Sequence, residues 1–482
     1  MKKFNDVFYR SVGVLALIVN IIFFTFLFKY NILPGKFRIL LLIIVAIIIF
    51  LFIYFLFTQK KSQTFLKIIS ILLIISSILQ GVFISYAKKS INTVEKINQK
   101  IELNSNEMSF VVLKDSNIKS LEEIGEKEIA TAETSDEDST MKTLHEYKIK
   151  YSKKLKTKDY GDYLNAAKSI LDGDYQVMLL NEGYRPLLEE SIEEFSSKTR
   201  VLESVVVTNK SNQKDENKAV GEQESFNVYI SGIDTYGNLS TVSRSDVNMI
   251  VSVNPKTKNI LITTIPRDTY LAIGGDNNKK DKLTHAGLFG VDTSKKSLEK
   301  FLDISINYYG KVNFTTLTDL IDVIGGITVN NPVNFNTSGG TYSFPKGQIE
   351  MDGAKALAYS RERYNLSEGD FDRGKNQTRV MEGIIKRMLR PEMLLKFNQT
   401  ADIILKSVNT DVPYSKMIEM VNDQLDNGGD WKIQTQALKG RGAANLKSYL
   451  MPNSKLYMMK ADENSIKVVH QKIEENNKQD KN

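Results

Sequence analysis

Three apolar runs near the N-terminus constrain this chain more than any other feature. They span Val12–Phe28, Ile39–Phe57 and Ile68–Tyr86, and the second run contains no charged residue. Each run is close to the roughly 20 residues that a helix needs to cross the hydrocarbon core of a bilayer. A signal peptide would give one such run with a cleavage site, not three in succession. The sequence therefore predicts a membrane region, residues 1–90, with three transmembrane helices.

The basic residues that flank these runs barely distinguish the two sides of the membrane. Six of them lie on one side and five on the other: Lys2, Lys3, Arg10, Lys60, Lys61 and Lys67 against Lys29, Lys36, Arg38, Lys88 and Lys89. Because positive residues concentrate on the cytoplasmic side, a cytoplasmic N-terminus is slightly favoured. Three crossings from there place the remaining chain outside the cell.

The chain after the apolar runs is polar and long enough for two water-soluble domains. Short strand-like and helix-like segments within residues 98–207 predict a smaller α/β accessory domain. The polar stretch Thr208–Ser225 is typical of a linker. A second α/β domain is predicted for residues 226–470.

This second domain alternates strand-like and helix-like segments. The predicted strands are Phe226–Ser231, Met249–Val253 and Asn259–Thr264, and the last two form a hairpin across an Asn-Pro turn. The predicted helices are Thr316–Ile324, which ends at a Gly-Gly pair, and Gln377–Leu389. Strands alternating with helices favour a layered α/β sandwich.

Composition excludes several kinds of site. The chain has no cysteine and only three histidines, which rules out disulfides and thiolate metal sites and argues against a histidine zinc site. The formal net charge is +7. A mild excess of this kind is compatible with a polyanionic substrate or an anionic lipid surface, and equally with an ordinary solvated surface.

Charged residues cluster in six short blocks of the second domain. The blocks are GIDTYG with Asp234, SRSDVN with Arg244 and Asp246, IPRDTY with Arg267, KLTHAG with Lys282, YSRERYN with Arg361 and Arg363, and EGDFDRGKNQ with Arg373 and Gln377. Guanidinium groups suit the oxygens of phosphates, and a carboxylate or two suits a divalent cation bound to phosphates. The blocks thus favour a site for a phosphorylated substrate and magnesium.

Spacing adds to this interpretation. Gly353–Tyr359 is predicted to lead into an extended segment, in which Arg361 and Arg363 would point to one face. Arg373 and Gln377 are four residues apart and would share a face at the start of a helix, where the helix dipole attracts anions. Asp234 and Asp246 are the carboxylates best placed for a metal.

Each feature also has an ordinary structural explanation that the sequence leaves open. An Arg-x-Arg pair is often a surface ion pair, and Asp234 beside glycine can form a turn. Asp370 and Asp372 are expected to cap the following helix. His285 is expected to be a structural residue rather than a base.

Taken together, the blocks resemble the LytR-CpsA-Psr family of Gram-positive cell-envelope enzymes, and most of all its capsule-associated CpsA branch. The resemblance is carried in order by GIDTYG, SRSDVN, TTIPRDTY, KLTHAG, DLIDVIGGI, YSRERYN and EGDFDRGKNQ, over about Phe226–Leu389. It implies an extracytoplasmic α-β-α sandwich with a mixed central sheet and an apolar pocket for a polyprenyl chain. The three helices and the extra domain before this core also resemble the capsule branch.

The resemblance implies an enzyme that transfers a glycopolymer, capsular polysaccharide in this branch, from an undecaprenyl-pyrophosphate carrier onto peptidoglycan. It places phosphate-binding arginines at Arg267, Arg361, Arg363 and Arg373, with further phosphate contacts at Lys282 and Gln377. It ties Asp234 and Asp246 to magnesium and to orienting the arginines. We expect Arg267, Arg361 and Asp234 to be catalytic, and we expect Arg244 to bind the pyrophosphate together with Lys282, Arg361, Arg363, Arg373 and Gln377. It implies Mg²⁺, or Mn²⁺, held by Asp234 and Asp246. The chain has Thr284-His285-Ala286 where some members have Asn-Ala, so the role of His285 stays open.

Two other functions remain possible from the sequence. A hydrolase could use the same residues with water as the acceptor, and a non-enzymatic regulator of capsule synthesis could use them to sense the lipid carrier. The expected partners are the lipid-linked polysaccharide, peptidoglycan, the cell membrane and capsule biosynthesis proteins. A nucleic-acid partner is not expected, because no cytoplasmic basic module follows the core. The expected location is the cell membrane, with the catalytic domain outside.

Overall fold

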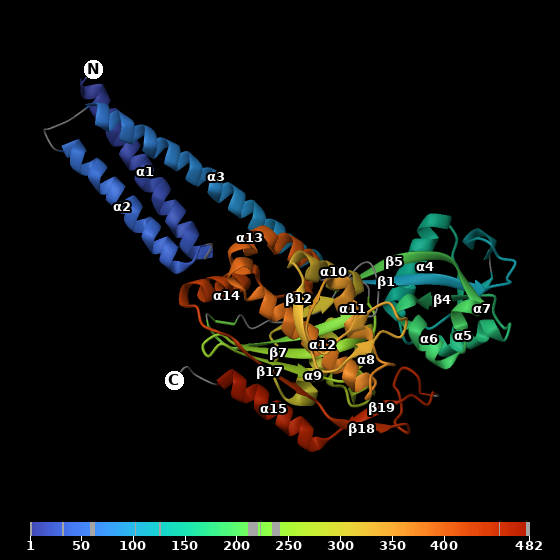
Figure 1. Cartoon of the computed structure of the whole chain (residues 1–482). Helices are drawn as coiled ribbons and strands as arrows, with labels where there is room; N and C mark the ends of the chain where they lie inside the picture. The colour runs from blue at the N-terminus through green and yellow to red at the C-terminus, as the bar shows by residue number, and fades with distance from the viewer. Residues whose placement is uncertain are drawn as a thin grey trace. The chain divides into compact units, whose positions relative to one another are not determined.

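The computed structural model describes residues 2–30, 33–57, 63–101, 103–124, 127–210, 220–221, 223–233, 242–452 and 454–478. The chain divides into two compact units, coloured along the sequence in Figure 1. The first holds residues 1–99, 394–399 and 412–430, and the second holds the rest. Asp234 lies outside the described residues, as does most of the predicted linker.

The first unit contains three long helices, α1 (Lys2–Tyr30), α2 (Gly35–Phe57) and α3 (Gln63–Ile101). Each includes a stretch long and apolar enough to cross a membrane: Val7–Tyr30, Gly35–Tyr54 and Leu66–Ser85. The three predicted helices are therefore confirmed. The buried side-chain nitrogen of Gln80 donates to the Asn20 amide oxygen over 2.9 Å, which gives the most polar residue of the third run a hydrogen bond between α3 and α1.

The start of α2 is tied to helix α14 (Tyr414–Asn427), which belongs to the same unit. The Asp426 carboxylate accepts hydrogen bonds from the backbone N–H groups of Gly35 and Lys36, the latter over 3.2 Å. These are donors that a helix N-terminus leaves without an intrahelical partner. In a chain that crosses the membrane three times, the start of α2 and the end of α3 face the same side. The contact therefore agrees with three full crossings.

In the second unit, residues 103–210 form a five-stranded sheet of order β3-β2-β4-β1-β5. The strands are β1 (Leu103–Leu113), β2 (Glu128–Thr131), β3 (Lys156–Asp159), β4 (Val177–Asn181) and β5 (Thr199–Lys210). The helices are α4 (Glu137–Tyr151), α5 (Tyr163–Leu171), α6 (Arg185–Ser191) and α7 (Phe195–Lys198). This is the small α/β region that the sequence predicts before the core, and it is called the accessory region below.

The core sheet has six strands in the order β16-β11-β6-β7-β8-β17. They are β6 (Phe226–Ile233), β7 (Ser245–Asn254), β8 (Asn259–Thr264), β11 (Tyr308–Val312), β16 (Asn409–Thr410) and β17 (Lys432–Ala437). β11 runs parallel to β6 and β17 runs parallel to β8, whereas β6, β7 and β8 are antiparallel. The predicted mixed sheet is confirmed, as is the predicted hairpin.

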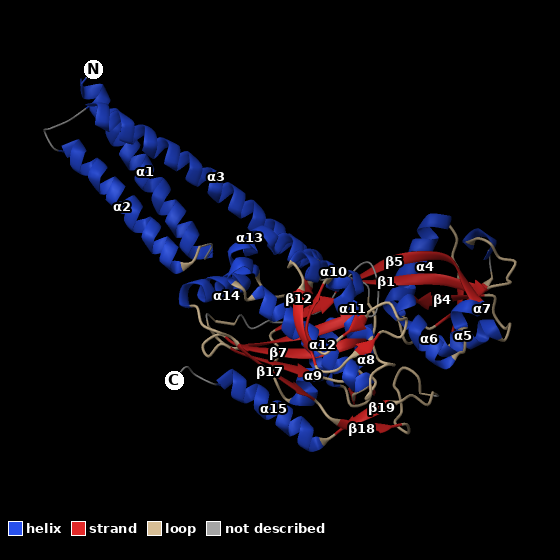
Figure 2. Cartoon of the chain, in the orientation of Figure 1, coloured by secondary structure: helices blue, strands red, loops and turns tan. Residues whose placement is uncertain are grey.

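Helices cover both faces of this sheet (Figure 2). On one face, α9 (Val291–Leu302) and α15 (Glu463–Lys478) share a buried apolar cluster with Tyr229, Ile250 and Leu261. On the other, α12 (Asp370–Met388) packs on β8, where the Thr264 and Thr378 hydroxyls lie 2.7 Å apart. Since successive strand residues face opposite sides, Leu261 and Thr264 mark the two faces. The fold is the predicted α-β-α sandwich.

The sequence prediction is wrong around Arg361. Gly353–Arg361 forms a helix, α11, where an extended segment was expected. Asp352 caps it by accepting from the Lys355 N–H over 2.8 Å, and the Ala-rich sequence GAKALAY favours a helix. Arg361 and Arg363 therefore do not share the face of a strand, contrary to the prediction.

Helix α12 also begins earlier than predicted, at Asp370 rather than Gln377. Its N-cap residue is Gly369, which has no side chain to cap with, so Asp370 and Asp372 lie in the first turn and are not the cap. The Asp372 carboxylate instead accepts from the backbone N–H of Glu368 over 2.9 Å, in the loop just before the helix. The prediction that Asp370 and Asp372 cap this helix is therefore wrong.

The accessory region and the core share one buried apolar cluster. It joins side chains of α5, α6 and their neighbours to side chains of the core, among them Tyr184, Leu187, Leu188, Leu288, Met451 and Met458. The backbone N–H of Val242 also donates to the carbonyl of Ser105 over 3.0 Å. The two parts therefore belong to one compact unit, and their division into separate domains stays a prediction.

Candidate active site

An ion pair between β7 and the loop after β8 lies at the centre of the site. Asp246 is on β7, and Arg267 follows the end of β8 in the adjacent antiparallel strand pair. The Nη1 group of Arg267 donates to Oδ2 of Asp246 over 2.9 Å, and the Thr284 hydroxyl donates to Oδ1 over 3.2 Å. The order of the strands thus brings together residues that the sequence separates by 21 positions.

Electrostatics keep both partners charged. Burial on its own would raise the pKa of Asp246, but the guanidiniums of Arg267, Arg244 and Arg373 hold it below its usual range. Burial works against the charge of Arg267, and the carboxylates of Asp246, Asp268 and Asp370 nevertheless raise its pKa. A carboxylate with a lowered pKa is a weak base, which suits Asp246 to orienting a cation.

Two cavities meet at this pair. The larger, of about 470 Å³, lies against β8, β17 and α12, and the smaller, of about 300 Å³, lies against α10 (Phe314–Val323), α11 and α12. Asp246, Arg267, Arg373 and Gln377 line both. These residues therefore form a wall that the two cavities share. Each cavity could accept a different part of a long substrate.

Arg373 and Gln377 project from the first two turns of α12, as their spacing predicts. Arg373 forms an ion pair with Asp370 at 2.5 Å. Burial and then the repulsion of Arg267 and Arg363 lower the pKa of Arg373, although Asp370 and Asp246 oppose this. Several cations thus lie close together and repel one another, and a bound anionic ligand would offset this repulsion.

Arg361 and Arg363 both line the smaller cavity, although no strand holds them. The Arg361 guanidinium stacks on Phe314 with 4.2 Å between its central carbon and the ring centroid. Between them in sequence, buried Glu362 accepts from the N–H groups of Arg363 (3.1 Å) and Asn365 (2.9 Å) and from the Ser338 N–H and hydroxyl (both 2.7 Å). Glu362, which the sequence analysis missed, fixes the turn that carries Arg363.

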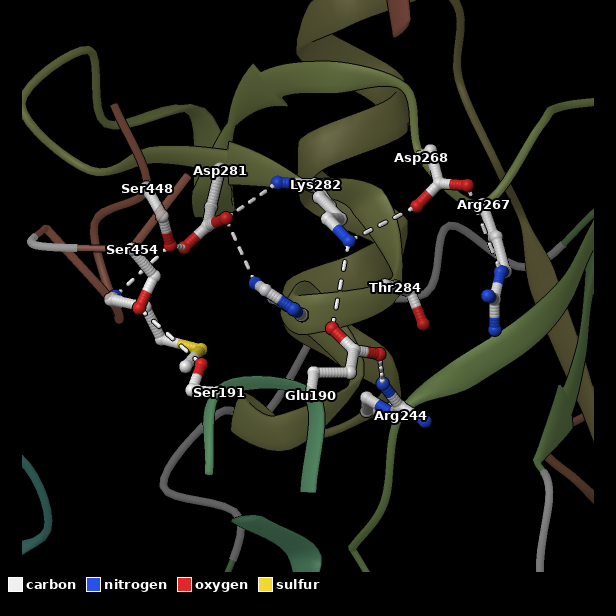
Figure 3. Close-up of polar contacts among 12 residues, drawn as sticks. Glu190, Ser191, Arg244, Arg267, Asp268, Asp281, Lys282, Thr284, Ser448 and Ser454 are labelled. Atoms are coloured by element: carbon white, nitrogen blue, oxygen red, sulfur yellow. Dashed lines mark hydrogen bonds and ion pairs between the residues drawn. The ribbon is translucent and has the colours of Figure 1, made fainter. Parts of the chain in front are cut away.

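Arg244 and Lys282 are the two remaining predicted phosphate contacts, and neither lines these two cavities. Both meet one carboxylate from the accessory region, that of Glu190 in α6 (Figure 3). Arg244 Nη1 donates to Oε1 of Glu190, and Lys282 Nζ lies 3.8 Å from Oε2. Lys282 also lies 3.3 Å from Asp268, whose other oxygen is 3.8 Å from Arg267 Nε. Lys282 is thereby linked to the central ion pair through Asp268.

Glu190 was not predicted. Asp268 follows Arg267 at the exit of the predicted hairpin's second strand, in the block IPRDTY, but no role was predicted for it. Glu190 lies in a region with no catalytic signature and comes close only through tertiary packing, so the sequence offered no signal for it.

His285 has a structural contact. Its Nδ1 lies 2.8 Å from the fully buried carboxylate of Asp281, which also accepts from the Ser448 hydroxyl (2.7 Å) and from the N–H groups of Leu450 (2.9 Å) and Lys282 (2.8 Å). This network anchors the segment that carries Lys282 to the chain near Leu450. It supports the expectation that His285 stabilises the fold.

The donor set fits a magnesium ion only in company with a phosphorylated ligand. No group of three or more His, Asp or Glu side chains suited to a metal occurs among the residues that the structure describes. Asp246 is a single carboxylate whose oxygens each have one hydrogen bond, which leaves lone pairs for a cation. Mg²⁺ bound to phosphates needs only one or two protein carboxylates. Asp246 therefore fits such an ion, and Asp234 lies outside the described residues.

Known proteins resemble the part of the chain that contains the core sheet and the site. The family model described as "LytR_cpsA_psr family" matches residues 194–471. The polyisoprenyl-teichoic acid–peptidoglycan teichoic acid transferase TagU of Bacillus licheniformis is 34% identical over 268 residues, which are 55% of this chain and 83% of that protein. TagU of Bacillus subtilis is 32% identical over 55% of this chain and 82% of its own length. The crystal structure of B. subtilis TagV aligns with a TM-score of 0.45 at 28% identity, over 53% of this chain and 98% of that one.

A second family model, described as DNA polymerase processivity factor, matches residues 59–180. This match begins before the apolar helix α3 and ends within the accessory region. It covers well under half of the chain and leaves out every residue of the site.

Proposed function

This chain belongs to the LytR-CpsA-Psr family, and we propose that it transfers a glycopolymer from an undecaprenyl-pyrophosphate carrier onto peptidoglycan. The observation that carries the proposal is the gathering of Arg267, Arg361, Arg363 and Arg373 around one cavity, where Asp246 is the carboxylate among the lining residues that the structure describes. Four guanidiniums on one cavity suit a diphosphate. The TagU relatives are named as transferases of teichoic acid from a polyisoprenyl carrier to peptidoglycan, which supports an enzymatic role.

The proposed reaction is a phosphoryl transfer. A hydroxyl oxygen of a peptidoglycan sugar forms a bond to the phosphorus that carries the glycopolymer. The bond between that phosphorus and the bridging oxygen breaks, and undecaprenyl phosphate leaves with its electron pair. The proton of the hydroxyl is lost. The product is a phosphodiester between the polymer and peptidoglycan.

The side chains contribute mainly by stabilising charge. Charge builds up on the phosphate oxygens during such a transfer, and fixed cations aimed at them are usually the largest source of acceleration. Arg267, Arg361 and Arg373 would hold these oxygens, with Arg363 and Gln377 as further contacts on the same cavity. Asp246 would orient Arg267. Because arginine does not act as a base, the group that takes the hydroxyl proton is assigned to none of these residues.

Mg²⁺, or Mn²⁺, is part of the proposal. Asp246 would hold it together with Asp234, the phosphates supplying further ligands, and the ion would neutralise phosphate charge.

The polymer is proposed to be a capsular polysaccharide. Support comes from the part of this chain that the TagU relatives do not cover. The 268 residues that match TagU of Bacillus licheniformis are 55% of the whole chain. The accessory region and the additional helices are the features that resemble the capsule branch. Capsule biosynthesis proteins are then the proposed partners of the accessory region.

The three N-terminal helices anchor the chain in a membrane. We place the catalytic core on the extracellular side, next to the bilayer that holds the carrier lipid. A substrate whose tail lies in the membrane can then reach an active site that is tethered beside it.

The proposal is tested with the full chain in proteoliposomes, supplied with Mg²⁺, peptidoglycan fragments and an undecaprenyl-pyrophosphate-linked saccharide of either capsular or teichoic type. The expected result is linkage of the capsular saccharide to peptidoglycan, which EDTA or Arg267→Ala abolishes. Release of free saccharide phosphate without linkage would favour a hydrolase. Binding of the lipid without any cleavage would favour a sensor, and preference for the teichoic donor would overturn the capsular assignment.

A further inference from the structure

Glu190 of the accessory region reaches two cations of the site from outside the core. It bridges Arg244 and Lys282, which come from two separate segments of the core (Figure 3). We propose that Glu190 is a positioning residue: it sets the separation and direction of Arg244 and Lys282 for pyrophosphate binding, so the accessory region completes the active site. This inference rests on the proposed function.

The position of Glu190 is fixed by packing on both sides of it. Its helix α6 contributes Leu187 and Leu188 to the apolar cluster that the accessory region shares with Met451 and Met458 of the core. At the end of the same helix, the Ser191 and Ser454 hydroxyls lie 3.3 Å apart. The carboxylate is therefore held against the core by buried apolar packing and by an exposed contact between two hydroxyls, neither of which involves its charge.

The position of Lys282 depends on the same part of the core. Its own backbone N–H, the Ser448 hydroxyl and the Leu450 N–H all donate to Asp281, the residue before it. Leu450 in turn is a member of the shared apolar cluster. One cluster thus anchors both the carboxylate and the ammonium that it meets, so their distance is set by the fold.

Electrostatics explain why the carboxylate is needed. Arg244 and Lys282 are largely buried, with 12% and 7% of their side chains exposed, and two such cations around one point repel each other. Glu190 lies between them as a counter-ion. Burial alone would raise the pKa of Glu190, but Arg244 and Lys282 hold it below its usual range, so it is charged at neutral pH.

Glu190 does not use up the cations. Arg244 has five N–H donors and gives one to Glu190 in the hydrogen bond described above. Lys282 has three donors, and its ammonium is no closer than 3.3 Å to Asp268 and 3.8 Å to Glu190. Both side chains keep donors for phosphate oxygens, so Glu190 orients them rather than competing with the substrate.

The test compares Glu190→Gln with a matched control, Glu193→Gln. Glutamine keeps the size of the side chain and removes its charge, and Glu193 is an exposed carboxylate three residues further along the chain. Binding of undecaprenyl pyrophosphate in detergent micelles with Mg²⁺ is measured by calorimetry for the full chain. Because Glu190 is partly exposed, we expect Kd to rise by about three- to fivefold in Glu190→Gln and to stay unchanged in Glu193→Gln.

Three further readouts separate positioning from a purely structural role. In the transfer assay, KM for the lipid donor should rise while kcat stays close to the wild-type value. This is expected when a variant loses an interaction that is equally strong in the bound ground state and in the transition state. Glu190→Gln should weaken binding less in an Arg244→Gln background than in the wild type, because part of its effect passes through Arg244 and only the part that passes through Lys282 remains. Thermal unfolding should change little in Glu190→Gln.

The outcomes are distinct. Unchanged or tighter binding of the lipid by Glu190→Gln would overturn this inference and leave the proposed function intact. Additive effects in the double variant would also overturn it. Failure of the wild-type chain to bind undecaprenyl pyrophosphate would instead overturn the proposed function, together with this inference.

Discussion

The carboxylate of Asp246 accepts from the guanidinium of Arg267 over 2.9 Å, and both side chains line both cavities of the site. This pair joins β7 to the loop after β8, and Asp268 extends it to Lys282. We propose that Asp246 orients Arg267 and holds a cation, and that it does not act as the base.

Asp246→Asn tests that role. The amide keeps the shape but loses the charge that orients Arg267, so kcat/KM for transfer should fall by about 10²-fold or more, the usual effect of losing one preorganised charge-stabilising group. Steady-state kinetics with the lipid-linked donor measure it. Asp174→Asn, an exposed aspartate in the accessory region, is the control. A variant with near wild-type kinetics would remove Asp246 from the site.

Arg361→Lys distinguishes shape from charge at the smaller cavity. Lysine keeps the positive charge but loses the planar fork and the stacking on Phe314, where the guanidinium lies 4.2 Å from the ring centroid. We expect transfer to fall by about tenfold, the equivalent of 1.4 kcal/mol, with binding of the donor also weakened. Full activity of the lysine variant would mean that Arg361 acts only as a point charge.

Because of Glu362, we expect the folding stability of the chain to depend on pH. Burial would raise the pKa of Glu362, but the N–H groups of Asn365, Ser338 and Arg363 and the Ser338 hydroxyl hold it below its usual range. Because the folded pKa is lowered, the stabilisation is complete above the unfolded value of about 4.3 and is lost as pH falls through the folded value. The difference in Tm between wild type and Glu362→Gln should thus be largest near neutral pH.

The measurement is a series of thermal unfolding curves from pH 7 to pH 3. At neutral pH, replacing this buried acceptor should lower the free energy of unfolding by about 1–3 kcal/mol. The gap should narrow below about pH 4. A gap that stays constant across the series would show that the charge of Glu362 does not stabilise the turn that carries Arg363.

The absence of native cysteine allows a direct test of orientation. Asn464→Cys places a thiol in the exposed first turn of α15, and Gln59→Cys places one between the second and third apolar runs. In intact cells a membrane-impermeant maleimide should label the first position and not the second. Labelling of Gln59→Cys alone would reverse the proposed topology.

The parts of the fold that the sequence predicted well are those with strong local signals. The three apolar runs and the hairpin of β7 and β8 belong to this group, because length, periodicity and turn residues determine them. Helix α11 was misread although Asp352 and the Ala-rich sequence carried the signal for it. The two arginines of the Arg-x-Arg pattern do not indicate an extended segment when the residues before them favour a helix.

The site was predicted less completely, for a physical reason. Arg267, Arg361, Arg363, Arg373, Gln377 and Asp246 do line shared cavities, as their blocks suggested. Glu190 and Glu362 could not be found in this way, since each acquires its importance from what it contacts in the folded chain. Glu190 meets Arg244 across 54 residues of sequence and Lys282 across 92, through packing that no local pattern records.

The most direct test of the central claim is the stoichiometry of products from a doubly labelled donor, with one label on the undecaprenyl chain and another on the saccharide. The full chain in proteoliposomes is given this donor, Mg²⁺ and peptidoglycan fragments. We expect each undecaprenyl monophosphate released to be matched by one saccharide joined to peptidoglycan through a phosphodiester, and we expect Arg267→Ala to yield neither product. Release of undecaprenyl phosphate with no label on peptidoglycan would contradict the claim that this chain is a transferase.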